Sequence, residues 1–341
     1  MAIDYPSLDK PTKGAFRFNT DTSQLEIYDG NQWTGVLSTS GELDTGGGRG
    51  IIAGGYTGPG SSGSTNIDYF NIQGKGSGID FGNLTDGRWG IATGSSRNRG
   101  LFAGGDSPGA VNTVEYITIP STGDAVDYGD LTAAHVYMGG LSNETRMLAC
   151  GGSTPTYAAD IDYTNIATTG NFIDSGFDIL AAAMMFTESA CSPTRGVLTS
   201  GTAPAKCQYV SILSMGNAAE FGTLSAAADT HSGICSNSTR GLVTVNIDGQ
   251  TNSNVIEYIT IASLGNATDF GDLNQNWSTY GTCASKTRGV WAGGRTYPAE
   301  ANVHMSYANI SSLGNANDFG DLQSGNGRAN CGLSNDHGGL P

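Results

Sequence analysis

Histidine side chains are the first candidates for metal binding or acid–base chemistry in this sequence. The four histidines, His135, His231, His304 and His337, lie far apart, and no two have the spacing of one helical turn or of a short zinc-type motif. A metal site would therefore need side chains that converge from separate parts of the fold. We predict histidines in loops and turns, and no metal centre.

Four of the six cysteines occupy one position of a repeated unit. Cys191, Cys235, Cys283 and Cys331 each lie four to six residues before an arginine or its histidine equivalent. Equivalent positions in different units are separated by a whole unit, whereas a disulfide needs Cα atoms within about 7 Å. We therefore expect buried, reduced cysteines that act as small apolar side chains.

Paired acidic residues are the remaining chemical candidates. Asp269 with Asp272, and Asp318 with Asp321, flank Phe-Gly in two turns and could bind Ca²⁺ through oxygen ligands. The alternative is that they are solvated loop ends, because EF-hand spacing is absent. No other cofactor is expected. The sequence also lacks a P-loop, so we predict that the protein is not an enzyme.

Composition and charge exclude several classes of partner. The chain has a net charge of −15, which repels phosphate backbones, so we expect no nucleic-acid binding. The longest nearly unbroken apolar run, residues 179–186, is far shorter than the roughly 20 residues that cross a bilayer, so we expect no membrane insertion. The first residues show no basic start followed by an apolar stretch, and we expect no secretory signal peptide.

An arginine followed by an apolar strand recurs along the chain. The spacing from Arg49 to His337, where Ser-Asn-Asp-His-Gly repeats the lead-in of each unit, corresponds to six units of 48 residues. The six arginines are Arg49, Arg99, Arg146, Arg195, Arg240 and Arg288. They could form an anion-binding ring, but repetition at a strand start favours a structural contact with carbonyls or an acid of the neighbouring unit.

Each unit then supplies three more short segments. The first is an alternating strand with a tyrosine, the second a strand after a Gly-Asn pair that predicts a tight hairpin, and the third a segment rich in Ala, Ser and Gly. The tyrosines, expected in the core between sheets, are Tyr69, Tyr116, Tyr163, Tyr209, Tyr258 and Tyr307.

Four strands at this period indicate an all-β, six-bladed β-propeller over residues 49–341. Residues 326–336 supply the fourth-type strand that the first unit lacks, so we expect the C-terminal strand to pair into blade one and close the ring.

We predict that residues 1–40 form a separate module and that residues 41–48 form a flexible Gly/Ser-rich linker. Within GAFRFNTDTSQLEIYDGNQWTGV, at residues 14–36, two alternating stretches flank an Asp-Gly hairpin signal. This pattern predicts a small β-hairpin or meander. Its apolar residues, which we assign to an attachment module, are Phe16, Phe18, Ile27, Tyr28 and Trp33.

Three resemblances extend this interpretation. A Gly-Gly after an apolar strand, with a tyrosine about 14 residues later, resembles the Kelch repeat, although units four and five lack the Gly-Gly and the usual tryptophan is absent. Residues 254–273, NVIEYITIASLGNATDFGDL, resemble the units of Kelch-like virion proteins of marine tailed phages. Residues 14–36 are similar to the GxxRFNTDTxxLExYDGxxW module of tail fibres and other phage structural proteins.

The resemblance implies a phage virion structural protein, made in the bacterial cytoplasm and attached to other virion proteins through its N-terminal module. A tail fibre or receptor-binding role is the first expectation, with a host-surface glycan as the partner. A capsid decoration or spike protein is the alternative from the same particle. A glycan-active enzyme on a propeller scaffold is the alternative from a different class.

The connection between the Gly-Gly strand and the tyrosine strand is the most variable part of the unit. Five of the ten prolines lie in these connections and would pre-order them. Tyr56, Tyr157 and Tyr297 add aromatic planes suited to stacking on sugars, so we predict that they bind a glycan. The alternative is that these are surface loops that merely tolerate variation.

Overall fold

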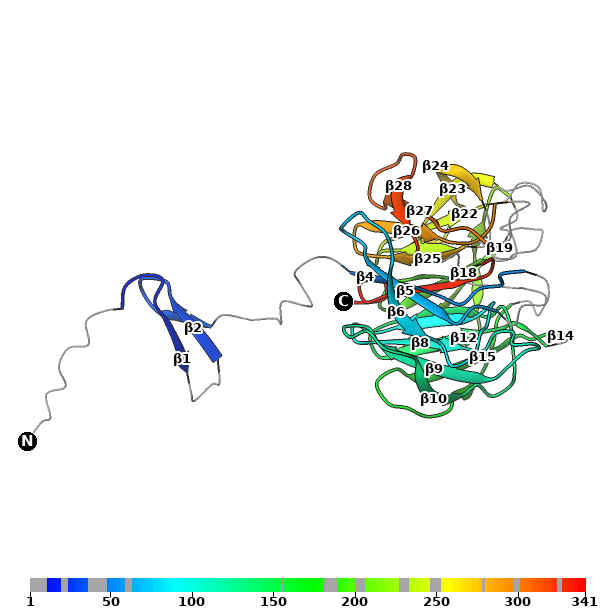
Figure 1. Ribbon diagram of the computed structural model, residues 1–341, viewed down its shortest axis with the longest axis horizontal. Helices are drawn as coiled ribbons and strands as arrows, with labels where there is room; N and C mark the ends of the chain where they lie inside the picture. The colour runs from blue at the N-terminus through cyan, green and yellow to red at the C-terminus, as the bar shows by residue number, and fades with distance from the viewer. Residues whose placement is uncertain are drawn as a thin grey trace, which may run out of the picture. The chain divides into compact units, whose positions relative to one another are not determined.

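The computed structural model describes residues 11–19, 24–35, 48–58, 63–154, 156–180, 189–199, 206–226, 233–245, 253–277, 280–296, 301–323 and 327–341. The chain divides into two compact units, Met1–Gly46 and Gly47–Pro341. Throughout the described ranges the regular structure is β-strand, and all sheet pairings are antiparallel, which confirms the all-β class (Figure 1). No helix in these ranges has the length and apolar character needed to cross a membrane.

The first unit contains a three-stranded meander of β1 (Phe16–Asn19), β2 (Gln24–Tyr28) and β3 (Trp33–Gly35). The turn between β2 and β3 is fixed by Asp29, whose Oδ1 accepts the N–H groups of Asn31 at 2.7 Å and Gln32 at 2.8 Å. These hydrogen bonds, that of Gln32 first, lower the pKa of the Asp29 carboxyl. Gly30 follows with φ of 105°, a conformation that favours glycine.

The apolar residues of the meander differ in burial. Tyr28 is buried and packs at 5.4 Å against Trp33, and the Arg17 guanidinium lies 4.4 Å above the Trp33 ring. Ile27 is partly buried, whereas Phe16 is 65% exposed. The backbone of Phe18 pairs with Leu25. Trp33 thus covers Tyr28 and Arg17, while Phe16 lies open to solvent.

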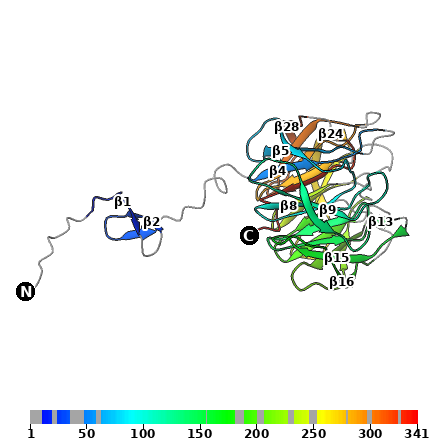
Figure 2. The same ribbon diagram turned by 60° about the horizontal axis from the view of Figure 1, so that its bottom comes forward.

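The second unit contains six four-stranded sheets within the described residues. In pairing order, sheet 1 contains β29 (Cys331–Ser334), β4 (Arg49–Ala53), β5 (Asn66–Asn71) and β6 (Ile79–Asn83), and sheet 2 contains β7 (Ala92–Ser95), β8 (Arg99–Ala103), β9 (Thr113–Thr118) and β10 (Val126–Asp130). Sheet 3 contains β11 (Gly139–Ser142), β12 (Arg146–Cys150), β15 (Asp160–Asn165) and β16 (Ile173–Asp178), and sheet 4 contains β17 (Ser189–Cys191), β18 (Arg195–Thr199), β19 (Lys206–Ser211) and β20 (Ala219–Thr223). Sheet 5 contains β21 (Ile234–Ser236), β22 (Arg240–Thr244), β23 (Ser253–Thr260) and β24 (Thr268–Trp277), and sheet 6 contains β25 (Gly281–Ala284), β26 (Arg288–Ala292), β27 (His304–Asn309) and β28 (Asn317–Asp321). A two-stranded ribbon, β13 (Ser153–Thr154) and β14 (Thr156–Tyr157), projects from sheet 3 (Figure 2).

The first strands of the six sheets contact one another in a cycle. They follow the order β29, β7, β11, β17, β21 and β25, and β25 contacts β29. The C-terminal strand β29, red in Figure 1, pairs with β4 in a register that sets Leu333 opposite Ile51. These six first strands, which we call the inner strands, are almost wholly buried because neighbouring sheets cover both of their faces. Each sheet contributes apolar side chains to the clusters between sheets, and the six cysteines are all buried and free, as expected.

The repeated arginines make the structural contact that their spacing favours. Each guanidinium stacks on the tyrosine of its own sheet, with 4.3 to 5.3 Å between the guanidinium carbon and the ring centre. Each also donates from Nη1 to a carbonyl of the following sheet: Arg49 to Ile119, Arg99 to Ile166, Arg146 to Ile212, Arg195 to Ile261, Arg240 to Ile310 and Arg288 to Ile72. The sixth contact returns to sheet 1. The tyrosines are partly buried beneath these arginines, not fully enclosed in the core.

A second contact between sheets uses the residue before five of the six tyrosines. The buried carboxylate of Glu115 accepts the N–H of Thr85 at 2.9 Å, and Asp162 accepts that of Thr132 at 3.2 Å. The same contact recurs with Gln208, Glu257 and Asp68 as acceptors. The side chain on the third strand of one sheet thus holds the chain leaving the fourth strand of the sheet before it.

The Gly-Asn pairs do not form the tight hairpin that the sequence predicts. Seven residues separate β27 from β28, and Asn315 in this connection accepts the N–H of Asp272, in β24 of sheet 5, at 3.1 Å. Gly271, with φ of 144°, lies so near Gly314 that a Cβ would stand 2.7 Å from its carbonyl oxygen. The Gly-Asn pair is therefore a docking point between neighbouring sheets, and the glycine of Phe-Gly-Asp allows the close approach.

Candidate functional site

Two places in the second unit collect polar or aromatic side chains. One is the central cavity between the six inner strands. The other is the loop face, defined as the end of the six-sheet body that carries the connections from the second to the third strand of each sheet and from one sheet to the next.

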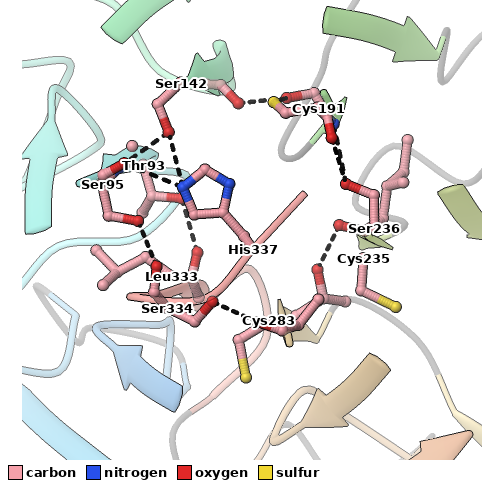
Figure 3. A pocket seen from close by; sticks show the side chains of 17 residues that line it. Thr93, Ser95, Ser142, Cys191, Cys235, Ser236, Cys283, Leu333, Ser334 and His337 are labelled. Atoms are coloured by element: carbon pink, nitrogen blue, oxygen red, sulfur yellow. Dashed lines mark hydrogen bonds between the residues drawn. The ribbon is translucent and has the colours of Figure 1, made fainter. Parts of the chain in front are cut away.

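The central cavity has a volume of about 60 Å³ and is lined by Ser, Thr, Cys and Gly residues of the inner strands (Figure 3). Hydroxyl groups in this lining bond to the backbone of the neighbouring sheet. Thr93 donates to Gly332 at 2.7 Å, Ser95 donates to Ser334 at 2.7 Å, and Thr282 donates to Ile234 at 2.8 Å. The hydroxyls thus link the sheets around the cavity.

His337 closes one end of this cavity, with its ring beside Ser95 and Ser142 (Figure 3). Its Nδ1 accepts the N–H of Gly339 at 3.1 Å, which leaves Nε2 as the protonated nitrogen that donates to the Ser95 carbonyl at 3.0 Å. Burial lowers the pKa of His337 to about 4, although the bond to Ser95 acts in the opposite direction. His337 is therefore neutral near pH 7.

The chemistry of the cavity is unsuited to catalysis. Both nitrogens of His337 are engaged with backbone groups, so neither can take a proton from a neighbouring hydroxyl. Burial raises the pKa of the Cys191 thiol to about 11, which keeps it protonated and a poor nucleophile. The volume also falls far below the roughly 300 to 1,000 Å³ of ligand pockets. The cavity is therefore a small space at the packed centre of the six-sheet body.

The acidic pairs lie on strands and not in turns. Asp269 and Asp272 belong to β24, and Asp318 and Asp321 belong to β28. Nδ1 of His304 lies 3.6 Å from Asp318 and 3.9 Å from Asp321. Among the described residues, no group of three or more His, Cys, Asp or Glu side chains has the arrangement of a metal site. His231 lies outside the described residues.

The loop face carries a cluster of aromatic rings that we call the platform: Tyr56, Trp89 and Tyr137, with Arg328 beside them. Trp89 lies in the middle, with its ring centre 5.8 Å from that of Tyr56 and 5.3 Å from that of Tyr137. The Arg328 guanidinium lies 4.6 Å from the Tyr56 ring centre. All four side chains are partly exposed. The other two tryptophans of this unit, Trp277 and Trp291, are fully buried.

Backbone links between three sheets hold the platform in place. The N–H of Gly90 donates to Ala329, and the N–H of Tyr137 donates to Gly90, both at 2.9 Å. These three residues precede the inner strands of their sheets and share positive φ, with values of 65° for Gly90, 60° for Tyr137 and 55° for Ala329. A Cβ on Gly90 would stand 3.0 Å from the Tyr137 ring. A tyrosine in this conformation is strained, and such strain persists where surrounding structure enforces it, often at binding sites.

The surroundings of Tyr137 keep its phenol group neutral. Burial raises the pKa of Tyr137, the positive charge of Arg328 lowers it, and the negative charge of Asp106 raises it. Asp106 is joined to Trp89 by two backbone hydrogen bonds, of 3.3 and 2.9 Å. The platform therefore combines aromatic rings inclined to one another, at 69° for Tyr56 and Trp89 and 59° for Trp89 and Tyr137, with a neutral hydroxyl, a guanidinium and a carboxylate. Such surfaces bind the apolar face of a sugar ring together with its hydroxyls.

The structure places two of the three tyrosines predicted to bind a glycan, and it places them on different sheets. Tyr56 belongs to the platform. Tyr157 is 43% exposed in the β14 ribbon, and Tyr297 lies outside the described residues. Trp89 and Tyr137 were not predicted because they precede inner strands and do not lie in the variable connections. The signal that could have found Trp89 is a large aromatic residue in the Ala-, Ser- and Gly-rich segment of a unit.

Neither a scan of protein-family models nor a search of curated proteins finds a match to this chain.

Proposed function

We propose that this chain is a six-bladed, Kelch-like β-propeller carried on the virion of a tailed bacteriophage, where it recognises a saccharide of the host surface as a tail fibre or other receptor-binding component. The observation that carries the proposal is the partly exposed platform of Tyr56, Trp89 and Tyr137 at the loop face. Aromatic rings of this kind supply contact area at low conformational entropy. The proposed role is binding without catalysis.

Contacts between the sheets support the propeller. The inner strands contact in a cycle, β29 from the end of the chain pairs with β4, and Arg288 of sheet 6 donates to Ile72 of sheet 1. In a propeller each blade buries a face that it cannot bury alone, and the last blade meets the first. The same contact types recur at successive junctions, as this architecture requires.

The N-terminal unit supports the virion location. Residues 14–36 resemble a module of tail fibres and other phage structural proteins, and Met1–Gly46 is a compact unit separate from Gly47–Pro341. We assign attachment to other virion proteins to this unit, including Tyr28 and Trp33. Deletion of residues 1–40 should leave a folded second unit that no longer enters phage particles. Immunoblots of purified particles test this, and normal packaging of the truncated chain would refute the attachment role.

Adsorption of the purified full chain to host cells tests the recognition role. Trp89→Ala removes the central ring of the platform, and we expect adsorption to fall at least tenfold with the melting temperature unchanged. Tyr157→Ala is the matched control, because it removes an exposed aromatic residue from the β14 ribbon and should leave adsorption unchanged. Loss with Tyr157→Ala alone would place recognition on the ribbon. Full adsorption by both variants would refute receptor binding and favour a capsid decoration, which a density map of the particle would show.

A further inference from the structure

A second hollow on the loop face is lined by a segment that adjoins Trp89 of the platform in the chain. It is a cleft of about 380 Å³, and residues 85–88 of the connection between sheets 1 and 2 form one part of its lining. The other part is Ser107, Pro108 and Val111 of the connection between β8 and β9, with Thr113 at the start of β9. Trp89 and Asp106, which immediately adjoin these two segments, are joined by backbone hydrogen bonds. The cleft and the platform are therefore built on the same pair of segments.

Buried charge fixes the wall of this cleft. Arg88 is 1% exposed, pairs through Nη2 with the buried carboxylate of Glu115, and donates from Nη1 to Gly104 at 2.9 Å and Thr113 at 3.0 Å. The hydroxyl and N–H of Thr85 donate to the other oxygen of Glu115. Because the guanidinium and carboxylate neutralise each other, this buried pair adds no net charge to the wall.

One polar atom of this wall has no partner. Among the described residues, Nε of Arg88 is buried and makes no hydrogen bond. This atom has almost no accessible surface, so the polar groups that a ligand in the cleft can reach belong to other residues of the lining. Ser107 adds a hydroxyl and Asp86 adds an exposed carboxylate to the same lining. The lining thus offers donors and acceptors for hydroxyl groups, and its one uncompensated charge is negative.

We propose that this cleft is a second saccharide subsite, and that the ligand is an uncharged oligosaccharide of at least two sugar units that extends from the platform into the cleft. This inference rests on the proposed function, because it assumes that the platform binds a sugar. The volume lies within the range of ligand pockets, unlike that of the central cavity. Asp86 and the net charge of −15 disfavour an anionic sugar at this position.

The test uses oligosaccharides released from the host envelope and separated by length and by charge. Each fraction competes with adsorption of the labelled full chain to host cells. We expect uncharged fragments of two or more sugars to inhibit at least tenfold more strongly than single sugars. Uncharged fragments should also inhibit more strongly than acidic ones of the same length. Stronger inhibition by acidic fragments, or equal inhibition by single sugars, would overturn the proposal.

Variants of the cleft make the assignment specific. Asp86→Asn should improve inhibition by acidic fragments about fivefold, the effect of removing one like charge near 4 Å in water. Ser107→Ala should weaken inhibition by uncharged fragments. Asp80→Asn is the control, because Asp80 is exposed on β6 away from the cleft lining.

The two proposals fail in distinguishable ways. If Trp89→Ala abolishes adsorption while Asp86→Asn and Ser107→Ala change nothing, the cleft is not a subsite and the proposed function stands. If neither Trp89→Ala nor the cleft variants change adsorption, both proposals are wrong. Melting temperatures within about 1 °C of the unchanged chain establish that each variant is folded.

Discussion

Replacing Leu333 with alanine tests whether the end of the chain completes the first sheet. Leu333 is 5% exposed in β29, opposite Ile51 of sheet 1, and its methyl groups lie against Gly100 of sheet 2. Both neighbours lie in hydrogen-bonded strands, so the cavity left by Leu333→Ala cannot collapse. Buried Leu→Ala changes cost about 2 to 5 kcal/mol, and for this rigid site we expect a loss of about 3 kcal/mol in the free energy of unfolding.

Calorimetry and urea unfolding of the full chain measure this effect. At roughly 2 °C per kcal/mol for a body of this size, the melting temperature should fall by about 6 °C. Leu313→Ala is the matched control, because Leu313 is 62% exposed in the connection before β28, and its melting temperature should change by no more than about 1 °C. Equal melting temperatures for the two variants would show that Leu333 of β29 is not packed against sheet 2.

Three further variants test the contacts between sheets and the role of His337 at the end of the central cavity. Gly129→Ala should lower the free energy of unfolding by about 1 to 3 kcal/mol more than Gly123→Ala. Both glycines have φ near 150°, but only at Gly129 would a Cβ meet another sheet, 2.6 Å from Gly170. Equal losses of the two variants in urea unfolding would refute the docking role of Gly129. Arg99→Lys loses the planar stack on Tyr116 and should cost about 1 kcal/mol by the same measurement, whereas an unchanged midpoint would contradict a structural role for the arginines. Because the folded protein lowers the pKa of His337 to about 4, the unfolded chain takes up a proton first as the pH falls from 6.5 to 4, and stability falls with it. His337→Asn should therefore lose less melting temperature than the unchanged chain between pH 7 and pH 5, and an equal loss would mean that His337 is not held neutral.

The repeat in the sequence predicted much of the fold. The spacing of Arg49, Arg99 and their equivalents located the second strand of each sheet, because a strand buried on both faces must be apolar and recur with the unit. The arginine contacts also followed from repetition. The prediction of a tight hairpin at the Gly-Asn pair was wrong because Asn315 accepts a hydrogen bond from another sheet. A local turn rule cannot include a partner that is distant in sequence. The acceptor role of Glu115 was missed for the same reason.

The candidate site could be predicted only in part. Tyr56 was found because it lies in a variable connection, but Trp89, Tyr137 and Arg328 come from three separate junctions that only the folded chain brings together. The strained backbone of Tyr137 has no signature in the sequence, since most residues with positive φ are glycine. The cleft beside Arg88 likewise depends on how two connections meet.

A crystal structure of the full chain with an uncharged oligosaccharide of the host surface that blocks adsorption shows directly where the sugar binds. We predict a sugar ring stacked on Trp89 between Tyr56 and Tyr137, with the chain of sugars continuing toward Asp86 and Ser107. A sugar bound at the opposite end of the six-sheet body, near His337, or on the β14 ribbon would refute saccharide binding at the platform.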